Sequence, residues 1–290
     1  EDSLIESNFS TFGGGGGRLL PSASSFGTFT VDIARSIIRS NATDLGGGGL
    51  ILGGNVTIVD SLISRNSAQQ DGGGVNAGTR TGETISIVRT TIDHNQSRDG
   101  AGLYVLSNPL FAGAVIIVDS TISSNDASRN GGGLFLAGNS GQLEVSHSTV
   151  VKNGAGVGSE IVRAGGGIYF SQSSANTSLS HVIVAGNSDN SEIGPDIYSI
   201  TPITDAVGFS LIGTNFGTGL VEAPIGSADA NGNFIGGPMH GAIDPRLGPL
   251  AFNGGRTMTH ALLPDSPAID AGNLAALVGI DGVPDFDQRG

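Results

Sequence analysis

The fold is decided by a stretch that the chain repeats with little change. Residues 84–106 read TISIVRTTIDHNQSRDGAGLYVL, and residues 114–136 read AVIIVDSTISSNDASRNGGGLFL. Each copy has an Ile three residues before an Asn, and a glycine cluster after it. An Asn preceded in this way by Ile or Val recurs every 25 to 34 residues, which is the self-similarity of a repeat protein. The recurring asparagines are Asn8, Asn41, Asn66, Asn95, Asn125, Asn153, Asn187 and Asn215.

Each repeat carries three sets of apolar residues, as around Asn95: Ile85 and Ile87 before it, Ile92 nearer to it, and Leu103 and Val105 after it. The period-two alternation of the pairs predicts strands. An odd step separates the first set from the second, so a bend must lie between them. The bend is expected near Asp60, Arg89, Asp119 and His147. Three short strands in each of about eight rungs predict an all-β protein, a parallel β-helix.

The asparagines fit the tight turns of such a coil. Asn tolerates left-handed backbone angles, and its amide can bond to the rungs above and below. We therefore expect an internal asparagine ladder. The glycine clusters lack the Lys and the following helix of a phosphate loop, so we expect them to supply unusual backbone angles at the start of the third strand.

Composition excludes several classes of protein. The chain has 290 residues, with 13% charged residues, no Cys and a formal net charge of -13. Nucleic acid and anionic lipid are therefore poor partners, and no apolar run is long enough for a membrane span. Low lysine content, acidity and many Gly, Asn, Ser and Thr are typical of secreted or cell-surface proteins, and we expect an extracellular location.

An aromatic column is predicted on the outside of the third strands. The position between the inward apolar pairs holds Tyr104, Phe135, Tyr169 and Tyr198, which include all three tyrosines of the chain. We call these four residues the aromatic stripe. Exposed aromatic side chains could stack sugar rings or dock another protein. Equally, the rings could stabilise the coil by stacking on one another between rungs.

Two groups of aspartates are candidate calcium ligands, although the fold requires no cofactor. Asp71 and Asp99 precede glycine clusters in adjacent rungs, where stacked carboxylates could hold Ca²⁺. Asp281, Asp285 and Asp287 form an acidic cluster near residue 290. Both groups are also ordinary turn residues.

Catalytic residues are not indicated by any pattern. Polysaccharide cleavage on such a scaffold needs paired carboxylates, or a metal ion with a basic residue, on one open face. His94, His147 and His181 are expected in different columns, and Lys152 has no Asp in register.

The last part of the chain is not periodic, and we divide the chain into repeats at 1–216 and an irregular segment at 217–290 that completes or caps the helix. Its motifs are DPRLGPL at 244–250, NGGRTMTHAL at 253–262, SPAIDAGN at 266–273 and DQRG at 287–290. With the upstream rungs, these motifs resemble the bacterial choice-of-anchor Q family of right-handed β-helix surface proteins. The resemblance implies an exported right-handed β-helix with no assigned catalytic residues. We expect the motifs to close the helix, with Asp270 and Arg289 as a buried ion pair.

Family members usually continue past DQRG, and residue 1 enters a rung midway, so we expect a segment of a larger protein. Open helix ends expose unpaired strand edges, which predicts other protein chains as partners there, by self-association into a filament or in a host assembly. The first prediction for function is a non-enzymatic extracellular structural or adhesive protein. The alternatives are a polysaccharide lyase or glycoside hydrolase, and a carbohydrate-binding module that uses the aromatic stripe on polysaccharide.

Overall fold

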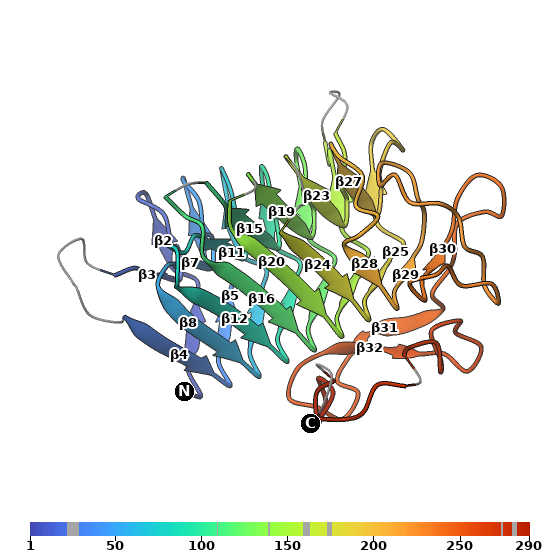
Figure 1. Ribbon diagram of the computed structural model, residues 1–290. Coiled ribbons are helices and arrows are strands. Elements are labelled where there is room, and N and C mark those ends of the chain that lie inside the picture. The colour runs from blue at the N-terminus through green and yellow to red at the C-terminus, as the bar shows by residue number, and fades with distance from the viewer. Residues whose placement is uncertain are drawn as a thin grey trace.

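The chain winds into a parallel β-helix. The computed structural model describes residues 1–21, 29–108, 110–138, 140–158, 163–172, 176–273, 275–279 and 283–290. In these ranges all regular structure is β-strand, and no helix is long and apolar enough to cross a membrane. Figure 1 shows the strands of successive turns stacked along one axis, from the blue N-terminal turn to the yellow ones.

Two of the four parallel sheets hold the strands that flank the predicted bend. The first, sheet D, contains β4 (Thr30–Ala34), β8 (Asn55–Val59), β12 (Thr84–Val88), β16 (Ala114–Val118), β20 (Gln142–Ser146), β24 (Thr177–Ser180) and β28 (Val207–Gly208). Sheet A contains β1 (Leu4–Glu6), β5 (Ile37–Arg39), β9 (Leu62–Ser64), β13 (Thr91–Asp93), β17 (Thr121–Ser123), β21 (Thr149–Val151), β25 (Ile183–Ala185), β29 (Leu211–Ile212) and β30 (Phe234–Ile235).

The other two sheets follow the asparagines. Sheet B contains β2 (Phe9–Ser10), β6 (Ala42–Thr43), β10 (Ser67–Ala68), β14 (Gln96–Ser97), β18 (Asp126–Ala127), β22 (Gly154–Ala155) and β26 (Ser188–Asp189). Sheet C contains β3 (Gly17–Leu19), β7 (Leu50–Leu52), β11 (Val75–Ala77), β15 (Leu103–Leu106), β19 (Leu134–Ala137), β23 (Ile168–Phe170) and β27 (Ile197–Ser199).

The predicted parallel β-helix is confirmed, with one difference in the strand count. Each turn has four strands instead of three, because two residues after each asparagine pair with the next turn as sheet B. The sequence gives no apolar alternation in that segment, so it carries no sign of these strands. Within the described residues, sheets B, C and D have seven strands each, so the coil makes about seven complete turns.

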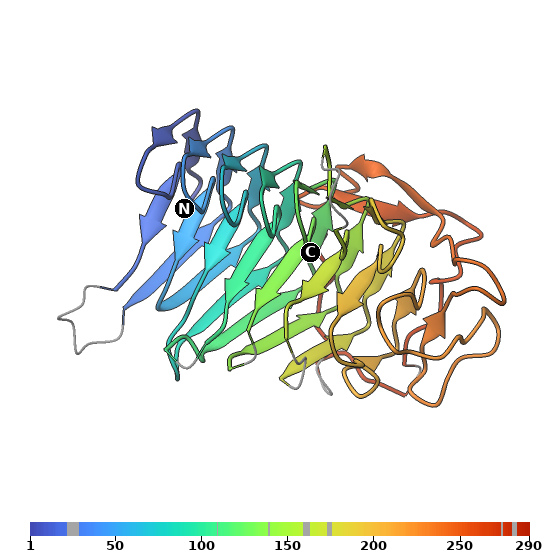
Figure 2. The ribbon, with the colours of Figure 1, turned by 90° about the horizontal axis from the view of Figure 1, so that it is seen from above.

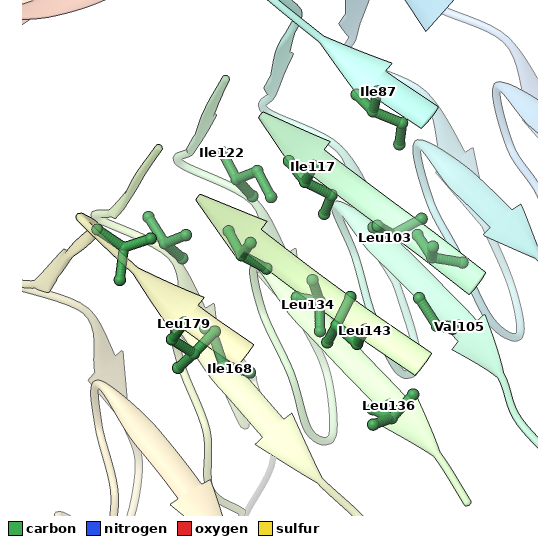
Figure 3. Close-up of a cluster of buried hydrophobic side chains, with 14 of the residues drawn as sticks. Ile87, Leu103, Val105, Ile117, Ile122, Leu134, Leu136, Leu143, Ile168 and Leu179 are labelled. Carbon is green, nitrogen blue, oxygen red and sulfur yellow. The ribbon is translucent and has the colours of Figure 1, made fainter. Parts of the chain in front are cut away.

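The predicted apolar sets fill the interior. Ile85, Ile87, Ile92 and Leu103 are all fully buried, and their equivalents in neighbouring turns lie directly above and below them. Figure 3 shows such side chains, labelled from several turns, gathered between the strands. Burial of each Ile or Leu stabilises the fold by about 1.5–3 kcal/mol.

Besides glycines of the clusters, two positions in most turns have left-handed backbone angles. One forms the bend between sheets D and A, as at Arg89 (φ 45°), which confirms the predicted position of the bend. The other directly precedes the asparagine, as at His94 (φ 52°), so the expectation that the asparagines themselves are left-handed is wrong. Such angles are costly for residues with a Cβ. They persist because the backbone remains paired between turns; the Arg89 N–H donates to the Val118 carbonyl at 3.1 Å.

The chain after residue 243 folds back along the side of the coil. Its regular part is a hairpin of β31 (Leu247–Ala251) and β32 (Thr259–Leu262). Figures 1 and 2 both place the C-terminus near the middle of the coil's length rather than at its end. We call residues 244–290 the C-terminal arm.

Candidate functional site

The recurring asparagines form a column of hydrogen bonds inside the corner between sheets A and B. At each step the backbone N–H and the Nδ2 of one asparagine donate to the Oδ1 of the next, at 2.9–3.0 Å. From Asn41 to Asn153 these residues are at most 1% exposed. An amide both donates and accepts, so identical amides satisfy one another in the absence of water. The asparagine column therefore stabilises the coil and offers no open site.

The column ends on an aspartate, and the prediction that Asn215 belongs to it is wrong. The N–H and the Nδ2 of Asn187 both donate to Asp196 Oδ1, at 3.0 Å each. Asn215 instead donates from its Nδ2 to the Leu220 carbonyl at 3.0 Å. Burial raises the pKa of Asp196 to about 6, although hydrogen bonds from Asn187 and from the Thr214 backbone oppose the rise.

Asp196 occupies the place that a glycine takes in the earlier turns. A Cβ on Gly133 would lie 3.0 Å from Asn153 Nδ2 and 2.6 Å from the Gly167 carbonyl oxygen, so the next asparagine already fills that space. Gly167 has the same relation to Asn187, and Asp196 is the equivalent residue one turn later. The carboxylate of Asp196 thus fills a space that no asparagine reaches. The change from Gly-Ile-Tyr at 167–169 to Asp-Ile-Tyr at 196–198 is the signal in the sequence.

The four rings of the aromatic stripe lie in register on sheet C and stack on one another. The ring centroids of Tyr104 and Phe135 are 5.2 Å apart, those of Phe135 and Tyr169 are 4.9 Å apart, and those of Tyr169 and Tyr198 are 5.1 Å apart. The rings are within 17° of parallel. Both faces of Phe135 and Tyr169 are therefore covered by neighbouring rings. A sugar that stacks on an aromatic ring needs an open face, and the stripe presents mainly ring edges.

The Asp71 and Asp99 carboxylates lie in adjacent turns, where arginines pair with both of them. Arg98 binds Asp71 at 3.0 Å and Asp99 at 3.4 Å, and Arg129 lies 3.5 Å from Asp99. Burial and these two carboxylates raise the pKa of Tyr104 to about 12, so this network adjoins the aromatic stripe. The guanidinium groups of Arg98 and Arg129 therefore supply positive charge at these two carboxylates. In the ranges that the structure describes, no three His, Asp or Glu side chains are grouped to hold a metal ion.

The acidic cluster near residue 290 is also arranged differently from the prediction. Asp287 accepts hydrogen bonds from the Arg289 side chain and backbone. The expected Asp270–Arg289 ion pair is wrong, since both residues are exposed and Arg289 pairs with Asp287 instead. Asp285 is exposed at the surface, and Asp281 lies outside the described residues.

The left-handed residues between sheets D and A present their side chains outward, and we call them the outer corner column. Its members are Asp2, Arg35, Asp60, Arg89, Asp119, His147, His181 and Phe209. Arg35 pairs with Asp2 at 2.8 Å, and Arg89 pairs with Asp60 at 2.7 Å. The rings of His147 and His181 stack at 4.7 Å, so the expectation that these two histidines lie in different columns is wrong.

The C-terminal arm is held against the outer face of sheet A by buried polar contacts. Gln288 is 9% exposed and donates from Nε2 to Thr91 and Thr257, while its Oε1 accepts from Thr121 at 2.6 Å. His260 lies 2.9 Å from Ser123 Oγ and 2.7 Å from the Gly248 carbonyl oxygen. The buried polar members of the C-terminal motifs are Thr257, His260, Ser266 and Gln288.

A groove of about 620 Å³ lies between the C-terminal arm and the coil, and we call it the arm groove. Asp119, His147 and His181 line it from the outer corner column, and Leu262 and Phe286 line it from the arm. Asp119 is only 5% exposed, yet no described residue makes a hydrogen bond or an ion pair with its carboxylate. Burial raises the pKa of Asp119 to about 6, which Arg89 opposes and Asp287 reinforces.

The histidines of the arm groove are also incompletely paired. Neither ring nitrogen of His147 has a partner among the described residues, and the same holds for Nε2 of His181. Burial lowers the pKa of both rings, so they are neutral near pH 7. The sequence placed Asp119 and His147 at the bend, but it carried no sign that a segment more than 100 residues away would cover them.

The family comparison agrees with this architecture. The family model described as a right-handed β-helix region matches residues 3–189, which is more than half of the chain. No curated protein and no solved structure matches the chain. The chain therefore belongs to the right-handed β-helix family.

Proposed function

We propose that this chain is a non-enzymatic structural or adhesive module of the cell surface or the extracellular space, of the choice-of-anchor Q type. The observation that carries the proposal is the pairing of outward side chains between turns. The carboxylates of Asp60, Asp71 and Asp99 are held by arginines, and the rings of the aromatic stripe cover one another. These groups stiffen a rod-like coil and leave few free groups for catalysis.

The acidic, lysine-poor surface supports an extracellular location. The chain has a formal net charge of -13, and Lys152 is its only lysine. Lys152 is exposed, so an amine-reactive reagent can reach it on a folded protein. We expect a reagent that does not cross membranes to label Lys152 on intact cells that make this protein. Labelling of Lys152 only after cell lysis would overturn the proposed location.

The absence of catalysis is tested on polysaccharides. We expect the purified chain to release no reducing ends and no unsaturated sugar products from neutral or acidic polysaccharides. Cleavage that is lost in Asp119→Asn but kept in Asp32→Asn would instead establish an enzyme, because Asp32 is an exposed residue outside the arm groove.

Adhesion is tested with immobilised glycans and matrix proteins, using the variant Tyr169→Ala. Loss of binding in this variant would assign the contact to the aromatic stripe. Because the faces of this ring are covered, we expect the variant to bind as the wild type does. Binding to none of these surfaces would remove adhesion from the proposal and leave the structural role.

A further inference from the structure

The arm groove contains polar groups that the protein itself does not satisfy. Asp119 and His147 both line the groove. No described residue makes a hydrogen bond or an ion pair with the Asp119 carboxylate, and both ring nitrogens of His147 are buried without a partner. A buried polar group without a partner is costly, and such groups are rare in folded proteins. Elsewhere in the same column, the Asp60 carboxylate is neutralised by Arg89 at 2.7 Å. A bound ligand can therefore supply the hydrogen bonds and the positive charge that the chain does not provide here.

The charges around the groove select the kind of ligand. Arg89 is already bound to Asp60, and Arg289 is bound to Asp287, so each of these two pairs is close to neutral. Asp119 and the exposed Asp285 remain as uncompensated carboxylates on the groove lining. The chain as a whole is strongly acidic. Anions are repelled by this arrangement, while a cation that carries hydrogen-bond donors is attracted.

The remaining walls suit the carbon skeleton of such a cation. Ile183 from sheet A and Leu262, Pro284 and Phe286 from the C-terminal arm line the groove with apolar surface. The volume of about 620 Å³ is within the usual range for sites that hold small organic ligands.

We propose that the arm groove binds an organic amine. The ammonium group of the amine donates to the Asp119 carboxylate, and a second donor of the ligand donates to a ring nitrogen of His147. The carbon skeleton of the ligand packs against Leu262 and Phe286. Two sources share this chemistry, an amino sugar and an aliphatic polyamine. The inference goes beyond the proposed function and does not depend on it, because a structural protein and an enzyme could each bind such a ligand.

The experiment measures binding to the whole chain by titration calorimetry at pH 7.5. The probes are a glucosamine trimer and spermidine as the two amines, a glucose trimer as the neutral match, and a galacturonate trimer as the anionic match. We expect at least one amine to bind, and the glucose and galacturonate trimers to bind at least about tenfold more weakly than that amine. Preference for the glucosamine trimer or for spermidine identifies the source of the amine.

Two variants locate the site, and a third is the control. Asp119→Asn should weaken amine binding by about tenfold or more, because a charged hydrogen bond is lost. Ala261→Trp should block binding from the arm side, because Ala261 is exposed and lines the groove. Asp32→Asn removes the same charge at an exposed site outside the groove and should bind as the wild type does.

Amine binding should also weaken as the pH falls below about 6, because Asp119 then becomes protonated. The ionisable groups around Asp119 are Arg89, His147 and His181 in its own column, and Asp285, Asp287, Arg289 and His260 on the arm side of the groove. The proposal is overturned if neither amine binds, if the glucose or the galacturonate trimer binds as tightly as the tighter of the two amines, or if both Asp119→Asn and Ala261→Trp bind amines like the wild type.

Discussion

The asparagine column and the outer corner column lie at the two ends of each sheet A strand, and they solve the same stacking problem differently. Inside, seven successive turns repeat one residue, because only a side chain that donates and accepts can bond to its own copy without water. Outside, the corner holds Asp, Arg, His and Phe in succession. Most of these side chains are exposed or pair with the neighbouring turn, so their chemistry can vary. The interior column therefore sets the coil, and the outer column is where a site can be built.

The largest expected effect comes from breaking the interior column. Asn125→Ala removes the acceptor of two hydrogen bonds from Asn95 and the donor to Asn153. The donors that remain are buried, so the free energy of unfolding should fall by about 4 kcal/mol. The control is Asn215→Ala, which lies outside the column and should cost about 1 kcal/mol. Urea unfolding of both variants measures the difference, and equal losses would contradict the special role of the column.

The end of the interior column should make stability depend on pH. The folded pKa of Asp196 is about 6, while an unfolded aspartate has a pKa of about 3.9. Between these values the folded state binds more protons, so the contribution of Asp196 to stability falls as the pH rises from 4 to 6, by about 3 kcal/mol.

Asp196→Asn isolates this contribution, because other groups titrate in the same window. The half-buried His147 and His181 and the buried His260 have lowered pKa values, and their contribution to stability is lost as the pH falls. Relative to the wild type, the variant should therefore be more stable at pH 7 than at pH 4 by about 3 kcal/mol. The free energies of unfolding of the variant and the wild type, measured at both pH values, test this. If the difference between the two proteins is the same at pH 4 and pH 7, Asp196 does not titrate in this range.

Within the outer column, two aspartates should respond in opposite directions to the same change. Asp60→Asn loses the pairing with Arg89 and should cost about 1 kcal/mol. Asp119→Asn removes an unpaired buried charge and should stabilise the protein by about 1–2 kcal/mol at pH 8, but not at pH 4, where the carboxyl is protonated. Chemical unfolding at the two pH values distinguishes them. A loss of stability in both variants at pH 8 would show that Asp119 is paired in solution.

The smallest effect is expected where the outer column is fully open to water. Arg35 pairs with Asp2 and Glu1, whose side chains are 64% and 67% exposed. Exposed ion pairs contribute little, so Arg35→Gln should leave the thermal midpoint unchanged. A clear drop in the midpoint of this variant, comparable to that of Asp60→Asn, would mean that burial does not set the strength of these pairs.

The sequence by itself determined most of what repeats. The apolar columns, the bend at Arg89 and Asp119, the asparagine column from Asn8 to Asn187 and the aromatic stripe all follow from register, because a coil places like residues above like. The sequence did not predict sheet B, because its two-residue strands lack an apolar pattern. The sequence also extended the asparagine column to Asn215, because the residue that ends the column, Asp196, lies only nine residues after Asn187 instead of one full repeat later.

Only the tertiary structure decided the position of the C-terminal arm, which has no repeat. The C-terminal arm docks through Gln288 and His260 onto residues 137 to 197 positions earlier in the chain, and these contacts obey no period. That docking covers Asp119 and His147 and turns a solvated corner into the arm groove. Local periodicity encodes each turn in its own residues, whereas burial by a distant segment depends on the free energy of the whole folded chain.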